Sequence, residues 1–293
     1  MFYGFNLVEA DKEGRLDCYE SAGNEYFERY SGQLKNFSDT FNKYVRKGCL
    51  DGDIIQEEWF PSIEADVFIS HSHDDKPLAL KLAGFLHKEF GLQPFVDSFI
   101  WGYAENLLNG LVEKYGDSMR GCYYGYKGNR EKNSSCNRMK RYASHVHMML
   151  TTALVGMMDK CECLFFLNTQ KSCNASQLNQ MESTVSPWIY MEMSLSRTIR
   201  RKDLICERYQ YIRQGQRAQT YMQESAGQVD IAHRLQLNHL DTITPGGLLQ
   251  WLATNRKYEI NQSHQKRFPL DDLYRQTDAL RKLEAWKQKR QNI

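Results

Sequence analysis

A short apolar run followed at once by a polar segment is the clearest structural signal in the chain. Residues 65–70 (ADVFIS) are typical of a buried parallel strand, and residues 71–76 (HSHDDK) predict the polar loop that follows it. A helix is expected from about Pro77, and Gly91 is expected to end it. Because residues 92–96 (LQPFV) predict a second strand, we expect a βαβ unit with a right-handed crossover.

The pattern of apolar and polar segments continues through the middle of the chain. We expect a loop at 98–102 and a helix over 104–115. Residues 116–142 are rich in Gly, Asn, Ser and Tyr and show little periodicity, which favours an inserted loop. Apolar residues at helical spacing then predict a helix over 143–158, and residues 161–167 (CECLFFL) form the most apolar strand candidate in the chain.

The two ends of the chain differ from this α/β region in their pattern. Aromatic residues recur at helical spacing between residues 16 and 44, so we expect a helical N-terminal extension over residues 1–61. The residues toward the C-terminus are less regular and predict a mixed extension over 211–293. The α/β domain is then expected over residues 62–210.

Composition narrows the class of protein. The chain has 293 residues, of which 41% are hydrophobic and 25% charged, the balance of a globular protein. No apolar run approaches the roughly 20 residues that span a bilayer, so we expect no membrane segment. A net charge of +2 does not produce the strong positive electrostatic field that attracts nucleic acid, so we predict no direct nucleic-acid binding. The N-terminus lacks an apolar signal segment and the eight cysteines include no CxxC pair, so we expect reduced thiols in a cytoplasmic protein.

One glutamate stands in an apolar helix stripe. Ser186 is expected to cap this helix and Pro187 to occupy its first position. Trp188 and Glu192 are then one turn apart on the same face, where an unpaired carboxylate is costly. Two interpretations stay open at this point: a functional carboxylate, or a glutamate at the edge of the core that pairs with an arginine such as Arg197.

A second candidate site is the segment His71-x-His73-x-Asp75 after the first predicted strand. It resembles the opening of the metallo-β-lactamase metal motif, and two histidines with a carboxylate can hold zinc. Lys76 stands where that motif needs a further histidine. We therefore prefer a polar loop at the carboxyl end of a parallel strand, which is where open α/β sheets bind their ligands, and we predict no metal.

Other common motifs of nucleotide-binding and hydrolytic enzymes are missing from the sequence. It contains no GxxxxGKS/T, no GxGxxG and no GxSxG segment. These absences argue against a P-loop enzyme, a Rossmann dehydrogenase and an α/β-hydrolase.

Four segments together resemble Toll/interleukin-1 receptor (TIR) domains. Residues 66–75 (DVFISHSHDD) resemble the first strand and its loop, residues 93–97 (QPFVD) the second strand, and residues 161–169 the fourth strand. Residues 186–192 (SPWIYME) resemble the motif of catalytic TIR domains, in which a tryptophan precedes the essential glutamate by four residues. The resemblance covers about residues 62–210 and is greatest to bacterial TIR proteins, among which anti-phage defence effectors occur.

The resemblance implies a fold and an activity. TIR domains have a flavodoxin-like parallel sheet with helices on both faces, and catalytic members cleave NAD+ between nicotinamide and ribose, then hydrolyse, cyclise or transfer the product. By position, Glu192 would be the catalytic glutamate and Trp188 would line the pocket, while residues 98–103 would gate it. The other substrate-binding residues that the resemblance implies are Ser70, His71, Ser72, His73, Asp74, Asp97 and Trp101. NAD+ is then a substrate, and no cofactor is expected.

Two alternatives and one assembly hypothesis remain. The chain could be a non-catalytic TIR scaffold, or a metal-dependent hydrolase that uses His71, His73 and Asp75. By resemblance we expect a homo-oligomer, or an assembly with a partner protein of a defence system. The terminal extensions are the candidates for controlling that assembly.

Overall fold

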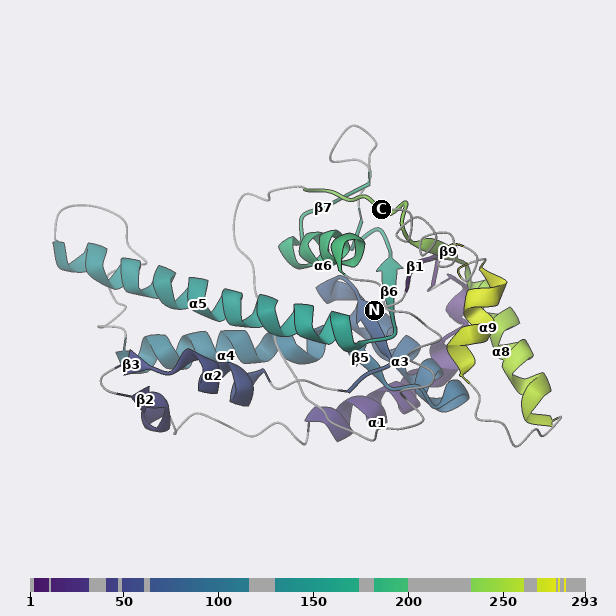
Figure 1. Ribbon diagram of the computed structural model, residues 1–293, viewed down its shortest axis with the longest axis horizontal. Helices are drawn as coiled ribbons and strands as arrows, with labels where there is room; N and C mark the ends of the chain where they lie inside the picture. The colour runs from purple at the N-terminus through teal and green to yellow at the C-terminus, as the bar shows by residue number, and fades with distance from the viewer. Residues whose placement is uncertain are drawn as a thin grey trace, which may run out of the picture.

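The computed structural model describes residues 3–10, 12–31, 41–46, 49–60, 64–115, 130–173, 182–199, 233–260, 268–277, 279 and 282. A five-stranded parallel sheet forms the centre of the molecule, in the order β5-β4-β6-β1-β9. The strands are β1 (Tyr3–Val8), β4 (Val67–Ser70), β5 (Pro94–Val96), β6 (Cys163–Asn168) and β9 (Asp241–Ile243). Helices cover both faces, so the predicted α/β flavodoxin-like class is confirmed (Figure 1).

The strand order departs in one respect from the common flavodoxin-like order 2-1-3-4-5. If β4 is counted as strand 1, then β5 is strand 2 and β6 is strand 3. The first three strands of the sheet, β5-β4-β6, therefore follow the common order 2-1-3. The fourth place is taken by β1 from the N-terminus, and β9 completes the edge. Phe5 is paired with both Phe165 of β6 and Asp241 of β9, which shows that β1 is an interior strand.

The expectation of a purely helical extension over residues 1–61 is therefore wrong for Tyr3–Val8. Five of these six residues are buried, and Gly4 lets the strand approach Leu240 closely, since a Cβ at this position would meet Leu240 Cδ2 at 2.4 Å. Gly4 and Asn6 interrupt the apolar run, which is why the sequence pattern does not reveal the strand. The sheet thus unites strands from all three predicted segments rather than from 62–210 alone.

Two hydrophobic layers hold the helices on the sheet. Alternate strand residues face opposite sides, so that Val67 and Ile69 join one layer and Phe68 joins the other. The first layer contains helices α1 (Glu20–Ser31), α3 (Lys76–Phe90), α8 (Pro245–Ile260) and α9 (Pro269–Gln276). The second contains α2 (Gly52–Trp59), α4 (Ser98–Tyr115), α5 (Arg130–Lys160) and α6 (Pro187–Thr198).

Short elements complete the described part of the chain. Two antiparallel ribbons pair β2 (Val45–Arg46) with β3 (Cys49–Leu50) and β7 (Ser183–Thr184) with β8 (His233–Arg234). The 3-10 helices are η1 (Lys12–Gly14), η2 (Asp17–Tyr19), η3 (Phe41–Tyr44) and η4 (His73–Asp75). None of the described helices is both long enough and apolar enough to cross a membrane.

The predicted βαβ unit is confirmed, whereas two predicted loops are helical. Helix α3 ends at Gly91, which adopts the left-handed conformation with φ of 65°. Helix α4 begins at Ser98, so the loop expected at 98–102 is its first turn. Of the loop expected at 116–142, residues 130–142 belong to α5, because this stretch contains neither Gly nor Pro to stop a helix. Residues 116–129 lie outside the described part of the chain.

Candidate active site

Local sequence determines where α6 begins and which side it buries. The Ser186 side chain accepts a hydrogen bond from the Ile189 backbone N–H at 3.3 Å, and Pro187 occupies the first helical position. Both sequence expectations are confirmed. This start places Trp188 and Glu192 one turn apart on the buried side, with exposed fractions of 9% and 0%. Burying a carboxyl group at this position requires polar partners.

The first polar partner of Glu192 comes from β4. The Ser70 hydroxyl donates a hydrogen bond of 2.6 Å to Oε2 of Glu192, and both side chains are fully buried. Ser70 is the last residue of β4, so this contact lies at the carboxyl edge of the sheet. Strand β4 is also the switch point of the sheet: the next strand of the sheet in sequence, β5, lies on one side of it, and the following one, β6, lies on the other. Parallel α/β sheets bind their ligands at such switch points.

Two further polar side chains complete the cluster. His71 directly follows β4 and Asp97 directly follows β5, and both are fully buried. His71 Nδ1 lies 2.5 Å from Oδ1 of Asp97. The Asp97 backbone N–H donates to the Ile69 carbonyl, which holds the end of β5 against β4. We name Ser70, His71, Asp97 and Glu192 the buried polar cluster.

Burial changes the ionisation of every titratable member of the cluster. Desolvation raises the pKa of Glu192, and the adjacent Asp97 carboxyl raises it further, while the Ser70 hydrogen bond acts in the opposite direction. Desolvation also raises the pKa of Asp97, and hydrogen bonding from the backbone N–H groups of Ser98 and His71 counteracts this rise. Burial lowers the pKa of His71 to about 3, so that its ring is neutral at pH 7.

Trp188 has a neighbour that the sequence analysis did not place in the site. The ring of His147, from α5, stacks on the Trp188 ring with a centroid separation of 5.8 Å and an interplanar angle of 24°. The two residues lie 41 positions apart in the sequence, and no motif connects them. Only the packing of α5 against α6 brings them together.

The remaining predicted substrate-binding residues do not join the buried polar cluster. Ser72 is half-buried, whereas His73 and Asp74 are exposed within the 3-10 turn η4. Trp101 lies in the first turn of α4, and its side chain lies outside the described residues. The resemblance therefore identified four residues of one cluster, Ser70, His71, Asp97 and Glu192, with Trp188 beside it.

The structure brings neither the proposed metal ligands nor the proposed ion pair together. His71 is buried beside Asp97, whereas His73 is exposed. Within the described residues, no group of three or more His, Cys, Asp or Glu side chains is placed to hold a metal ion. Arg197 lies on the exposed side of α6, so the core-edge pairing with the fully buried Glu192 does not form.

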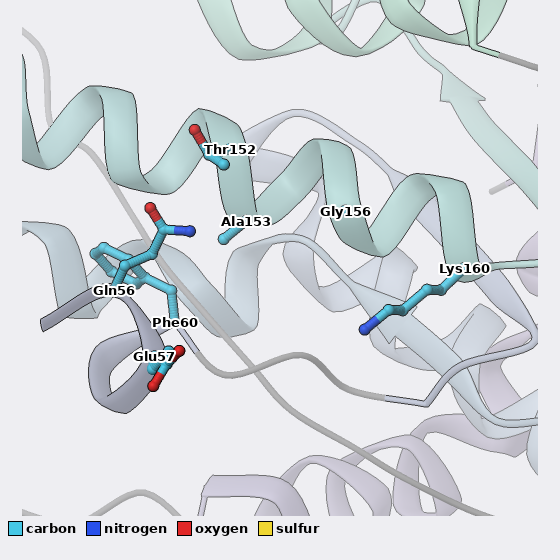
Figure 2. A pocket seen from close by; sticks show the side chains of 7 residues that line it. All are labelled: Gln56, Glu57, Phe60, Thr152, Ala153, Gly156 and Lys160. Atoms are coloured by element: carbon cyan, nitrogen blue, oxygen red, sulfur yellow. The ribbon is translucent and has the colours of Figure 1, made fainter. Parts of the chain in front are cut away.

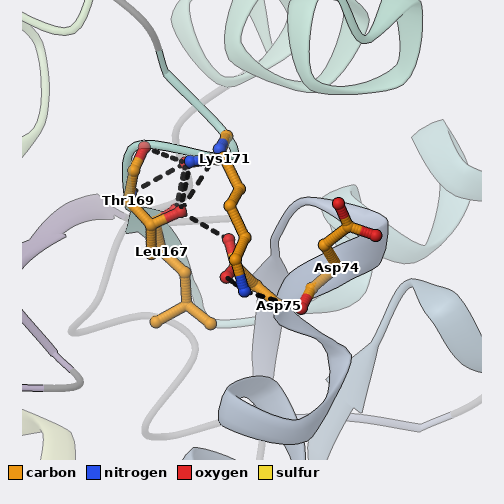
Figure 3. A network of polar contacts seen from close by, with 6 residues as sticks. Asp74, Asp75, Leu167, Thr169 and Lys171 are labelled. Carbon is orange, nitrogen blue, oxygen red and sulfur yellow. Dashed lines mark hydrogen bonds and ion pairs between the residues drawn. The ribbon is translucent and has the colours of Figure 1, made fainter.

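Asp75 has a different role from the one that a metal site would give it. Thr169 Oγ1 donates to Asp75 Oδ2 at 2.5 Å, and Lys171 Nζ lies 3.3 Å from Asp75 Oδ1 (Figure 3). Lys171 also donates to the Asp74 carbonyl at 3.1 Å. These contacts tie the turn after β4 to the loop after β6, and they stabilise the carboxyl edge of the sheet next to the cluster.

Two cavities of the described structure lie outside the buried polar cluster. One, of about 340 Å³, opens between α2 and α5 and includes Phe60 and Gly156 in its wall (Figure 2). The other, of about 200 Å³, lies at the carboxyl edge and is lined in part by Asp75, Lys81 and Lys171. Glu192 lines neither cavity. Its side chain is fully buried and therefore has no surface open to a ligand in this structure.

Comparison with known proteins identifies no relative: no protein-family model, curated protein or solved structure matches the chain.

Proposed function

We propose that the protein is a TIR-type NAD+ glycohydrolase that cleaves the bond between nicotinamide and ribose, with Glu192 as its catalytic residue. The observation that carries this proposal is the place of Glu192: fully buried, one turn from Trp188, and hydrogen-bonded to Ser70 at the switch point of a parallel sheet. A carboxyl group in this position combines a ligand-binding edge with a low-dielectric surrounding.

The chemistry of NAD+ cleavage suits a single buried carboxylate. Loss of nicotinamide builds positive charge on the ribose, as in other reactions with an oxocarbenium-like transition state. Nicotinamide leaves from a cationic ring, so the reaction needs no strong general acid. A carboxylate beside the ribose stabilises the developing charge, and in a dry site such an interaction supplies several kcal/mol. Water then attacks to give ADP-ribose, or the product is cyclised or transferred to another acceptor.

Each member of the site has a task in this proposal. Ser70 holds the Glu192 carboxyl in one orientation through its hydrogen bond. Trp188 supplies an apolar wall, which the stacked ring of His147 keeps in place. Asp97 lies where β5 passes into α4, so movement of the first turn of α4 changes access to Glu192. We assign the gate to this helical turn rather than to a loop.

We further propose that the enzyme acts in the cytoplasm of a bacterium, in anti-phage defence, and that assembly activates it. The TIR resemblance of residues 62–210 suggests this setting. The complete burial of Glu192 supports activation by a rearrangement, since the isolated chain holds the carboxyl group away from solvent.

Chromatography of NAD+ reaction products tests the proposal. Wild-type protein, assayed over a range of concentrations so that assembly can occur, is expected to release nicotinamide. Glu192→Gln is expected to slow this release by on the order of 100-fold or more while the fold survives. Glu105→Gln, which changes an exposed carboxylate on α4, is the matched control and is expected to behave as wild type. Equal nicotinamide release by Glu192→Gln and wild type rejects the proposal.

Complete burial of Glu192 also favours a second candidate, a TIR scaffold without turnover. In that case the contact with Ser70 is purely structural and serves to hold α6 on the sheet. The two candidates differ in one result. A scaffold forms oligomers that release no nicotinamide at any concentration.

A further inference from the structure

The buried polar cluster contains more acidic groups than its surroundings can neutralise. Asp97 and Glu192 are both fully buried, and each carboxyl group affects the ionisation of the other. Among the described side chains, no lysine or arginine forms an ion pair with either of them, and the ring of His71 is the group beside Asp97. Two carboxylates that share a dry site cannot both ionise without a large cost.

The partners of the two carboxyl groups differ, and this difference decides which one carries the charge. Asp97 stands at the N-terminal end of α4, where the helix dipole favours an anion. His71 Nδ1 also lies 2.5 Å from Oδ1 of Asp97. Glu192 receives one neutral hydroxyl donor, Ser70. The anion is therefore better stabilised on Asp97, and a proton is better placed on Glu192.

Neighbouring charges do not reverse this order. Asp75 and Lys76 lie close enough to act on His71, and their effects on its ionisation oppose each other. On the side of α5, the ring of His147 stacks on the ring of Trp188. Neither helix α5 nor η4 therefore brings a described cation against Asp97 or Glu192.

We propose that Asp97 and Glu192 share a single proton in the closed protein, with the charge on Asp97 and the proton on Glu192. Asp97 is then a positioning residue that controls when Glu192 ionises. This inference deepens the proposed function and its catalytic part rests on it, whereas the shared proton is a property of the protein alone.

The shared proton gives the site a means of responding to a cation. The nicotinamide ring of NAD+ carries a positive charge, and its arrival beside the cluster supplies the missing counter-charge for a second carboxylate. The O–H bond of the Glu192 carboxyl then breaks, its proton passes to solvent, and the carboxylate remains to stabilise the ribose cation. No oxidant or further reactant is involved.

The first test needs no catalytic activity. Unfolding by denaturant is measured between pH 5 and pH 8 for wild type, Glu192→Gln and Asp97→Asn. Above the ordinary pKa of a glutamate, the folded wild type keeps a proton that the unfolded chain has lost. Its folding equilibrium constant, relative to that of Glu192→Gln, is expected to fall about tenfold per pH unit. Equal pH slopes for wild type and Glu192→Gln overturn the inference.

Asp97→Asn distinguishes proton sharing from simple burial. Without the neighbouring charge, Glu192 ionises at lower pH. The fall of the folding equilibrium constant with pH, relative to Glu192→Gln, is then expected to stop at a pH about one unit or more below that of wild type. Glu105→Gln on the same helix is expected to keep the wild-type slope. An unchanged slope in Asp97→Asn contradicts the role of Asp97.

Infrared spectroscopy provides the test if Asp97→Asn fails to fold. Wild-type protein at neutral pH is expected to show the carbonyl band of a buried protonated carboxyl group, and Glu192→Gln is expected to lack it. Absence of that band from wild type overturns the inference.

The pH profile of nicotinamide release adds the catalytic readout. The midpoint of its acid limb is expected to fall by about one pH unit or more in Asp97→Asn, and Asp97→Glu is expected to restore it. A wild-type midpoint in Asp97→Asn contradicts control by Asp97. If the protein shows the proton-linked slope but releases no nicotinamide, the shared proton is supported and the proposed function is rejected. If it releases nicotinamide but lacks that slope, the proposed function is supported and the shared proton is rejected.

Discussion

Ser70 and Glu192 lie 122 positions apart in the sequence and are joined by a hydrogen bond of 2.6 Å in the interior of the protein. Ser70 ends β4, and Glu192 lies in the second turn of α6. The contact therefore connects the switch point of the sheet to the helix that carries the proposed catalytic carboxyl group. Its loss affects both folding and the orientation of that group.

Ser70→Ala tests this contact. The variant removes the donor and leaves a buried carboxyl oxygen without its partner, so we expect a loss of about 1–3 kcal/mol in the free energy of unfolding. Denaturant unfolding measures this loss. Because the hydrogen bond lowers the pKa of Glu192, the variant is also expected to shift the acid limb of NAD+ cleavage to higher pH. Ser194→Ala, a half-buried serine on the helix that carries Glu192, serves as the control. Equal losses in the two variants would show that the contact has no special role.

Trp188→Ala and Trp188→Phe separate the indole wall from the fold. Removing the whole side chain creates a cavity beside His147 and is expected to cost about 3–5 kcal/mol of stability. Phenylalanine keeps an aromatic surface, so Trp188→Phe is expected to lose less stability and to retain more NAD+ cleavage than Trp188→Ala. Both quantities are compared with those of Tyr190→Ala, which changes an exposed aromatic residue on the same helix. Identical results for Trp188→Ala and Trp188→Phe contradict a role for the aromatic wall.

The burial of His71 predicts a pH dependence of opposite sign to that of the carboxyl groups. Its pKa in the folded protein is lowered to about 3, so between pH 6.5 and pH 3 the unfolded chain binds a proton that the folded protein does not. Stability therefore falls as the pH falls through this range, by about 1.4 kcal/mol per pH unit at most. His71→Gln is expected to lack this contribution. The difference in unfolding free energy between wild type and His71→Gln is therefore expected to fall as the pH falls. A difference that does not change between pH 6.5 and pH 4 contradicts a neutral, buried His71.

Removal of residues 1–10 tests the place of β1 in the sheet. Because β1 pairs with β6 on one side and β9 on the other, the truncated chain is expected to lose cooperative unfolding, measured by circular dichroism. Gly4→Ala is the milder variant, and the clash of its Cβ with Leu240 is expected to cost about 1–3 kcal/mol. A truncated chain that unfolds with wild-type cooperativity would show that β1 is a dispensable extension.

The parts of the site that could be predicted from the sequence are those determined by short segments, such as a strand, a helix cap or a helix end. The short apolar run at residues 65–70 predicts β4, and Gly91 predicts the end of α3. The Ser186–Pro187 pair predicts the start of α6. Each of these signals acts over a few residues. The approach of Glu192 to the end of β4 came from the family resemblance, because spacing alone left a pairing with Arg197 open.

The features that escaped prediction depend on contacts between distant parts of the chain. Strand β1 is stabilised by pairing with β6, about 160 residues away, and its own six residues contain Gly4 and Asn6, which weaken a strand pattern. His147 reaches Trp188 only because α5 packs against α6. The first turn of α4 follows Asp97 without a loop, although the pattern of residues 98–102 gives no helical period.

Release of nicotinamide from NAD+, measured for wild type and Glu192→Gln over the same range of protein concentrations, tests the central claim most directly. We predict that wild type releases nicotinamide once assembled and that Glu192→Gln, with an unchanged fold and oligomeric state, is slower by on the order of 100-fold or more. Equal rates in the two proteins, or no release by assembled wild type, would contradict the account.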